Sequence, residues 1–319
     1  MKQQIIDRIL KKTGIPNLVD ALAEELSPGE LQSLLFKVIE LKTQKKEGNE
    51  LLKEYQENRF SKASDIDPVL HRKLEINILS LLPDDFKLIE LSPLTPLGTT
   101  SVLTTVHQNN IVPTIRNLEV AADTTNMLAL ECALRRKVLL KKNSKNTERI
   151  KLCSAQRLVR AQPFDNPAFS AHFCVVALCS AGKDEGNDKF EIVNLKEHIF
   201  FYLNLIEKLL DQSEIKKINI KLFKYPDSNT DSIIENIKKE LSDRAIVHFK
   251  IQKNSDFGRN YYSRLRFMIS IINNKNREFD YIDGGFTNWT SKLLNNNKER
   301  LLTSGIGTDI LLRTIKIIV

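Results

Sequence analysis

Long hydrophobic runs are absent from this chain of 319 residues. No apolar stretch approaches the roughly 18 residues that a helix needs to cross a bilayer. The first residues, MKQQIIDRILKKTG, carry charges where a secretory signal would be apolar. We therefore expect neither a membrane span nor an export signal, and we predict a cytoplasmic protein.

Cysteine is scarce, and its spacing is uninformative. The four cysteines, Cys132, Cys153, Cys174 and Cys179, form no CxxC pair and have no histidine pairs near them. Structural zinc sites and redox motifs usually show such spacing, and disulfides belong to oxidising compartments. We expect four buried thiols that act as small hydrophobic side chains, and no metal site.

Aromatic residues are missing from the most basic segment of a chain whose formal net charge is +8. The run RRKVLLKKNSKNTERIK, residues 135–151, contains eight Lys or Arg and one Glu. Such charge permits contact with RNA, but single-strand binders usually interleave aromatic side chains that stack on bases. We favour a solvated helix end and a hairpin loop, with RNA binding as an alternative.

Hydrophobic residues make up 41% of the chain, enough for a packed core. Residues 1–65 read as a separate helical module with a polar linker, EYQENRFSKASDID, at its end. Within it, S-P-G-E at residues 27–30 has the pattern of a capping box with proline at the first helical position. Residues 66–319 form the core domain in this interpretation.

The core alternates helices with strands joined mainly by hairpins. Helices are expected at 68–82, 122–137, 195–211 and 231–241, and strands at 86–98, 149–162, 171–181, 218–223, 245–251, 264–272 and 279–283. This order favours an α+β fold, an antiparallel-rich sheet flanked by helices. Two glycine clusters, Gly284 with Gly285 and Gly305 with Gly307, follow apparent strands. Glycine there indicates positive φ or close approach of a ligand.

The order of these segments resembles the catalytic core of class II aminoacyl-tRNA synthetases, over about residues 66–315. The nearest resemblance is to histidyl-tRNA synthetase and to the regulatory subunit of ATP phosphoribosyltransferase. FKLIELSPL, with Pro93, looks like motif 1. RLVRAQ, PFDNPAFSA and HFCVVALCSAG resemble motif 2. DFGRNYYSRLRF is similar to the histidine-recognition segment, YIDGGFTNW to the glycine-rich segment, and SGIGTDILLR to motif 3.

The resemblance implies roles for residues that would hold ATP. Arg160 matches the arginine that binds the α-phosphate, and Phe173 matches the residue that stacks on adenine, although an inward core position explains Phe173 equally well. Gln162 stands where the family has an acid, and the loop 163–171 contains no Lys or Arg. Because adenylation needs fixed positive charge and Mg²⁺ around the phosphates, these departures argue against ATP chemistry.

Motif 3 and the histidine-recognition segment depart from the family as well. Gly305, Gly307 and Asp309 match motif 3, but Ile310 replaces the arginine that grips ATP, with Arg313 one helical turn later. Phe257 replaces another arginine, and Arg259 lies two residues away. In the glycine-rich segment, Phe286 replaces an arginine and Asn288 stands where an acid is expected.

The pocket for an amino acid is better preserved. Asp123 and Thr125 resemble the family residues that hold a substrate's ammonium group, with helix capping as the competing interpretation of Asp123. Tyr261 and Tyr262 match the paired tyrosines, and we expect alternation along a strand to direct only one of them into a pocket. The glycines 284, 285, 305 and 307 would leave room for a ligand near the backbone.

The resemblance and its departures together predict a non-catalytic paralogue that binds a small amino-acid-like ligand or a protein partner in a regulatory role. The alternative is a divergent ATP-dependent amino-acid or carboxylate ligase. No cofactor is expected, and ATP with Mg²⁺ only under that alternative. No anticodon-binding domain follows motif 3, so tRNA is not expected as a partner. We expect a homodimer through Pro93 and helix 68–82, and a protein partner through residues 1–65.

Overall fold

The computed structural model describes residues 2–162, 170–226, 228–241, 244–253, 256 and 258–318. The chain divides into two compact units, Met1–Lys62 with Pro113–Leu118, and Ala63–Val112 with Glu119–Val319. The module boundary at residue 65 that the sequence suggests stays a prediction.

The first unit is helical. Its helices are α1 (Lys2–Thr13), α2 (Leu18–Asp20), a π-helical turn (Ala21–Glu25), α3 (Pro28–Thr43) and α4 (Gly48–Glu57). The capping box is confirmed, because the Ser27 side chain accepts from the Glu30 backbone N–H and the Glu30 carboxylate accepts from the Ser27 N–H. Many apolar side chains of this unit remain exposed, among them Ile9, Val19, Leu34, Val38, Leu41, Leu51 and Leu52.

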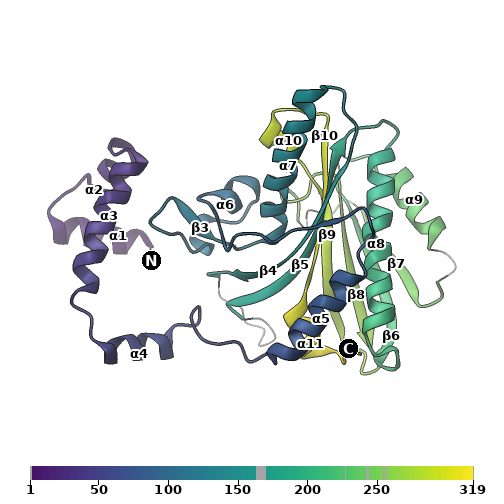
Figure 1. Ribbon diagram of the computed structural model, residues 1–319, viewed down its shortest axis with the longest axis horizontal. Coiled ribbons are helices and arrows are strands. Elements are labelled where there is room, and N and C mark those ends of the chain that lie inside the picture. The colour runs from purple at the N-terminus through teal and green to yellow at the C-terminus, as the bar shows by residue number, and fades with distance from the viewer. Residues whose placement is uncertain are drawn as a thin grey trace. The chain divides into compact units, whose positions relative to one another are not determined.

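An eight-stranded sheet forms the second unit, in the order β1-β4-β5-β10-β9-β8-β6-β7 (Figure 1). The strands are β1 (Lys87–Leu88), β4 (Ile150–Val159), β5 (His172–Lys183), β10 (Glu299–Gly307), β9 (Glu278–Thr287), β8 (Leu265–Asn273), β6 (Ile215–Lys224) and β7 (Val247–Gln252). The inner pairs are antiparallel, and the outermost pair at each edge is parallel. The predicted α+β fold with an antiparallel-rich sheet is confirmed.

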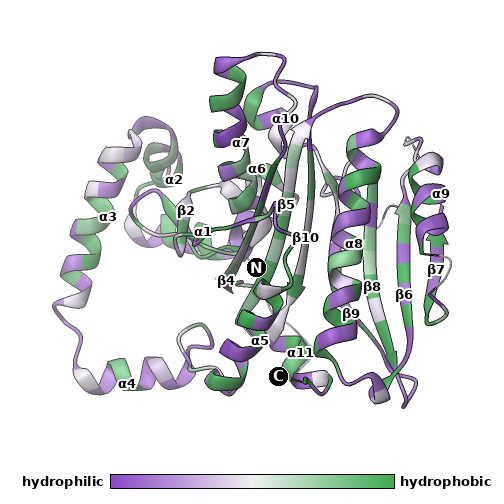
Figure 2. Ribbon diagram, turned by 45° about the vertical axis from the view of Figure 1, so that its right-hand side comes forward, coloured by the Kyte–Doolittle hydropathy of each residue, from purple (hydrophilic) through white to green (hydrophobic). Residues whose placement is uncertain are grey.

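Helices cover both faces of the sheet. They are α5 (Pro68–Ser80), α6 (Thr99–Leu103), α7 (Thr124–Lys142), α8 (Lys189–Leu209), α9 (Asp231–Glu240), α10 (Trp289–Leu294) and α11 (Thr308–Thr314). On β5, Val176 and Leu178 pack into the core under α5 and α8, whereas Ala177 and Cys179 pack toward α7 and Trp289. Figure 2 accordingly shows α7 and α8 with mixed green and purple turns.

The prediction of one long strand over residues 86–98 is wrong. This stretch contains only β1 and the short β2 (Leu94–Pro96), which pairs with β3 (Leu118–Val120). The ladder with β4 ends at Ile89, whose N–H donates to the Cys153 carbonyl oxygen at 2.9 Å. Further along, the N–H of Val159 at the end of β4 donates to the Ala121 carbonyl oxygen, so the chain after β3 and not this stretch lies beside β4 there. Within the described residues, no helix is long and apolar enough to cross a membrane.

Candidate functional site

A cavity of about 370 Å³ lies in the second unit, on the face of the sheet that α7 covers. Most of the predicted site residues line it: Asp123, Thr125, Arg160, Phe173, Tyr261, Tyr262, Gly305 and Gly307. Strand register explains part of this grouping. Gly305 lies opposite both Ala177 and Asp283, and Gly307 lies opposite Val175, so alternate residues of three neighbouring strands share one face.

Asp123 is the N-cap of α7, and its carboxylate also lines the cavity. Its carboxylate caps α7 by accepting from the backbone N–H of Thr125 at 2.9 Å and from the Thr125 hydroxyl at 2.7 Å. Its second oxygen accepts from the Tyr261 hydroxyl at 2.7 Å. Because the same side chain also lines the cavity, the start of α7 presents a fixed negative charge to any ligand there.

Arg160 places a positive charge beside Asp123. Its Nη2 lies 3.7 Å from Asp123 Oδ2, and its Nε donates to the carbonyl oxygen of Ala122 at 2.9 Å. The guanidinium carbon is 5.2 Å from the centre of the Phe173 ring, which is within the range of a cation–π contact. The side chains of Asp123, Arg160 and Phe173 therefore form one fixed group at the cavity wall.

Both tyrosines line the cavity, so the expectation that only one of them would do so is wrong. The segment is a turn rather than a strand, since Gly258 has φ of +79° and Asn260 has φ of +76°. The rings of Tyr261 and Tyr262 meet edge to face with centroids 4.7 Å apart. Burial, reinforced for Tyr261 by the charge of Asp123, raises the pKa of both hydroxyls.

Gly284 and Gly285 lie beneath the protein's own side chains and not in the cavity lining. A Cβ on Gly284 would stand 2.5 Å from Phe267 Cε1, and one on Gly285 would stand 2.6 Å from both the Leu265 carbonyl oxygen and Tyr262 Cδ1. Close packing between strands therefore requires glycine at both positions. The ligand contact that the sequence suggested for them stays a prediction.

Gln162 and Arg259 line smaller recesses beside the main cavity. The recess at Gln162, about 170 Å³, shares Asp123, Arg160 and Tyr261 with the cavity. The recess at Arg259 is also about 170 Å³ and shares both tyrosines. Arg259 donates to Asp256 at 3.1 Å. Both residues therefore lie in recesses that share lining residues with the main cavity.

The positions that hold ATP in the resembling family are poor in positive charge. Ile310 lines the cavity where motif 3 would place arginine, and Arg313 pairs with Asp65 instead of lining the cavity. Among the described lining residues, Arg160 is the only Lys or Arg, against Asp123, Asp280, Asp283 and Asp309. Phe257, which replaces a family arginine, and the loop 163–169, which lacks Lys and Arg, lie outside the described residues.

Asp283 and Asp309 are held by charged partners behind the cavity. Arg266 donates to both oxygens of Asp283, at 2.8 and 2.9 Å, yet burial still raises the pKa of that carboxyl. Burial also raises the pKa of Asp309, but hydrogen bonds from His71 and from the Cys174 backbone N–H bring it below its usual value. In return, Asp309 and then Cys174 raise the pKa of His71 to about 9.

Sequence reasoning did not single out His71. It lies on the inward face of α5, and its Nε2 is 2.9 Å from Thr308 Oγ1 and 3.5 Å from Asp309 Oδ1. No local spacing could have indicated the contact, because the partners lie at the far end of the chain. A polar residue on the apolar face of a helix was the only available signal.

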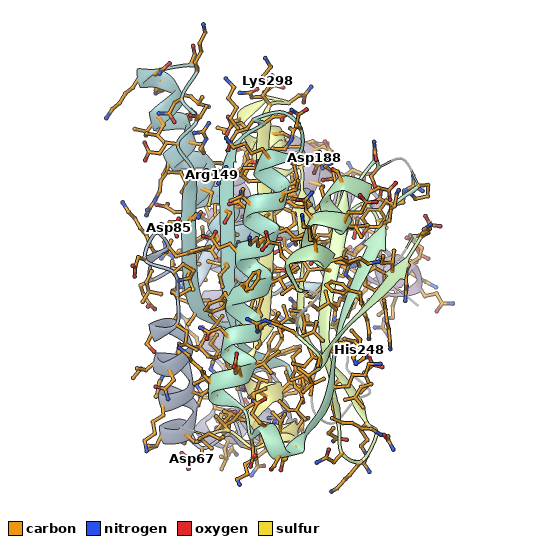
Figure 3. All side chains as sticks on the ribbon, turned by 90° about the vertical axis from the view of Figure 1, so that its right-hand side faces the viewer. Asp67, Asp85, Arg149, Asp188, His248 and Lys298 are labelled. Atoms are coloured by element: carbon orange, nitrogen blue, oxygen red, sulfur yellow. The ribbon has the colours of Figure 1, made fainter. Side chains whose placement is uncertain are left out.

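Several cations of the basic run at 135–151 form ion pairs within the fold. Arg136 is fully buried against Glu299, Arg149 pairs with Glu185, and Lys151 contacts Asp85 and Glu197. Figure 3 labels Asp85 and Arg149, two members of these pairs. These pairs remove three cations from any RNA-binding face. The expected solvated helix end and hairpin loop is therefore right only in part, because three of its cations are paired within the fold and its loop joins α7 to β4.

No family model matches the sequence, and no curated protein matches it. Solved structures do match. Histidyl-tRNA synthetase from S. aureus aligns with a TM-score of 0.56 at 14% identity, over 79% of this chain and 68% of that one. An ATP phosphoribosyltransferase regulatory subunit/histidyl-tRNA synthetase from Bacillus halodurans C aligns with a TM-score of 0.54 at 12% identity, over 79% and 81%.

A third match, histidyl-tRNA synthetase from a Nostoc species, has a TM-score of 0.57 at 12% identity over 80% of this chain and 74% of that one. At such low identity these matches establish the fold alone. The second unit has the class II aminoacyl-tRNA synthetase-like fold that the ordered motifs predicted.

Proposed function

We propose that this protein is a non-catalytic, class II synthetase-like protein that binds a small amino-acid-like ligand and acts in a regulatory role. The observation that carries this proposal is the pairing of Asp123 with Arg160, 3.7 Å apart, at the wall of a mainly aromatic and aliphatic cavity. An adjacent carboxylate and guanidinium complement the ammonium and carboxylate groups of an amino acid.

The geometry supports a specific orientation of the ligand. Asp123 Oδ2 accepts from Tyr261 and retains capacity for an ammonium donor, because a carboxylate offers about four acceptor sites. The Arg160 Nη atoms would take the carboxylate, while Nε stays on the Ala122 carbonyl oxygen. Phe173, Val175 and Met268 would surround the apolar part of the ligand. A pocket of this kind, apolar with a few convergent polar groups, is typical of small-molecule sites.

The charge distribution disfavours ATP as the ligand. Four aspartates and one arginine are among the described residues that line the cavity, whereas a triphosphate requires clustered cations and Mg²⁺. Ile310 offers none, and Arg313 is paired with Asp65. A protein that binds an amino acid without activating it fits these positions better than a synthetase does.

The divergent-ligase alternative rests on one contact. Arg160 lies over the Phe173 ring at 5.2 Å, the arrangement expected if these residues held a phosphate and an adenine. The ligase alternative predicts ATP–pyrophosphate exchange with at least one amino acid, and the non-catalytic proposal predicts none. A protein partner for a regulatory role would have an available surface in the exposed apolar side chains of residues 1–62, such as Leu34 and Val38.

Calorimetry with a panel of amino acids tests the proposal. Asp123→Asn keeps an acceptor oxygen for the α7 cap but removes the charge. We expect it to weaken binding at least about thirtyfold, since losing one partner of a desolvated charge pair costs about 2–5 kcal/mol. Asp67→Asn is the matched control, because Asp67 caps α5 in the same way but is exposed and outside the cavity.

Three results would count against the proposal. They are no binding by any member of the panel, equal binding by Asp123→Asn and the unchanged protein, and exchange of pyrophosphate. The last of these would favour the ligase alternative.

A further inference from the structure

Three side chains with metal-binding atoms meet at one wall of the cavity. They are His71 on α5, Cys174 on β5 and Asp309 on α11, and their donor atoms all lie within 4.8 Å of one another. All three residues are buried, while Cys174 and Asp309 also line the cavity. Each ligand atom is therefore held by a different element of the fold, and the group is reached from the cavity.

The spacing of the three atoms suits a tetrahedral ion. With metal–ligand bonds of about 2.0–2.3 Å, donor atoms in such a site are about 3.3–3.8 Å apart. His71 Nε2 and Asp309 Oδ1 are already 3.5 Å apart. Since no pair exceeds 4.8 Å, the donor atoms would have to approach one another by about 1–1.5 Å at most to bind one ion.

The Asp309 carboxylate supplies a second, independent observation. Its Oδ2 atom is buried and has no hydrogen-bond partner among the described residues. Its contact with Arg157 Nη1 is long, at 3.9 Å. A buried acceptor without a partner destabilises the folded state, and more so when it is charged. A cation coordinated by Oδ2, alone or together with Oδ1, would give this atom the partner that it lacks.

We propose that His71, Cys174 and Asp309 form a binding site for a divalent transition-metal ion, and that zinc is the ion they fit best. A thiolate with an imidazole selects zinc over magnesium or calcium, which prefer sites made of oxygen atoms. Binding would displace the thiol proton and any proton on Nε2, and would replace the contact of Nε2 with Thr308 Oγ1. This site goes beyond the sequence, from which we expected no metal.

The three ligands leave one coordination position for a further group. Zinc sites with three protein ligands usually keep a water or a substrate atom in the fourth position. Because Cys174 and Asp309 line the cavity, that position would be reached by water or by a carboxylate of a ligand in the cavity. The metal would also add positive charge to a wall that otherwise carries aspartates.

Cobalt substitution tests the site in the full chain. The purified protein is stripped with a chelator and titrated with Co²⁺, whose thiolate charge-transfer absorption reports a sulfur ligand, and Zn²⁺ is then added in competition. We expect one saturable cobalt site per chain that zinc displaces. Cys174→Ala should abolish the thiolate band. His71→Gln and Asp309→Asn should weaken zinc binding by more than the roughly 10–100-fold typical of losing an outer-shell partner.

Cys132→Ala is the matched control, because Cys132 is a fully buried thiol on α7 that is not part of the group. It should keep the cobalt band and the zinc affinity. Circular dichroism confirms that each variant is folded, and His71→Gln replaces Cys174→Ala if the latter does not fold. Absence of a saturable thiolate band in the unchanged protein, or a band that persists in Cys174→Ala, would overturn the proposal.

Discussion

Arg136 on α7 and Glu299 at the start of β10 form a two-point ion pair in which both side chains are completely buried. Nε and Nη2 of Arg136 donate to the two carboxylate oxygens at 2.8 and 2.9 Å. Nη1 donates to the Glu148 carbonyl oxygen at 2.7 Å. The pair links α7, which begins at the cavity, to β10, a central strand of the sheet.

Removing either partner should leave a buried charge without compensation. We expect Arg136→Met or Glu299→Gln to lower the free energy of unfolding by about 3–5 kcal/mol, measured by urea denaturation. The pair Arg72–Glu75, 2.6 Å apart, is the control because the Arg72 side chain is 70% exposed. Arg72→Met should cost no more than about 1 kcal/mol. Equal effects at the two pairs would contradict this prediction.

The close packing of Gly285 against Tyr262 and the Leu265 backbone can be tested by substitution. Gly285→Ala would bring a Cβ within 2.6 Å of a backbone oxygen, which cannot move aside as a flexible side chain would. We expect a loss of about 1–3 kcal/mol in stability, as for other overpacked sites. Gly48→Ala at the start of α4, where the added Cβ meets nothing within 4 Å, should be neutral. Thermal unfolding of both variants compares the two sites directly.

Acid should weaken the fold through His198. This side chain is fully buried between the hydroxyls of Ser180 and Ser304, and burial, with a smaller effect of the Lys151 charge, lowers its pKa to about 3. The unfolded imidazole titrates near pH 6.5. As pH falls below about 6.5, His198 therefore binds a proton in the unfolded chain but not in the folded chain. The free energy of unfolding then declines by up to about 1.4 kcal/mol per pH unit.

Urea denaturation between about pH 7 and 5 measures this slope, and His198→Gln should reduce it. Glu278, whose pKa is held at about 2 mainly by the Ser270 hydroxyl, contributes only at lower pH because unfolded glutamate titrates near 4.5. His248→Gln, on the exposed side of β7 (Figure 3), should leave the slope unchanged. A slope that His198→Gln does not alter would exclude His198 as its source.

The homodimer expected from the resemblance can be tested on α5. This helix turns His71, Leu74 and Ile78 inward and exposes Val69 and Ile76, an apolar stripe that a two-fold partner could cover. We predict a dimer in sedimentation at micromolar concentration, and monomers for Ile76→Glu because the interface would bury an unpaired charge.

Leu293→Glu, at an exposed position on α10, is the control for the dimer test and should remain dimeric. If the protein without substitutions is a monomer, the prediction is wrong.

Local patterns predicted most of the elements, whereas contacts between distant residues escaped them. The Ser27–Glu30 capping box and the β4–β5 hairpin follow from short-range spacing. The turn that directs both tyrosines inward depends on positive φ at Asn260, which sequence patterns for strands do not reveal. Arg136 and Glu299 are 163 residues apart, so only the folded sheet brings them together.

The edge strands of the eight-stranded sheet affect how molecules can associate. At one end stands β1, only two residues long, and at the other stands β7, whose exposed positions include His248, Lys250 and Gln252. A short strand and a polar, charged strand are poor templates for a strand from another molecule. Growth by strand addition is therefore disfavoured at both ends of the eight-stranded sheet, and concentrated protein should resist fibre formation through these edges.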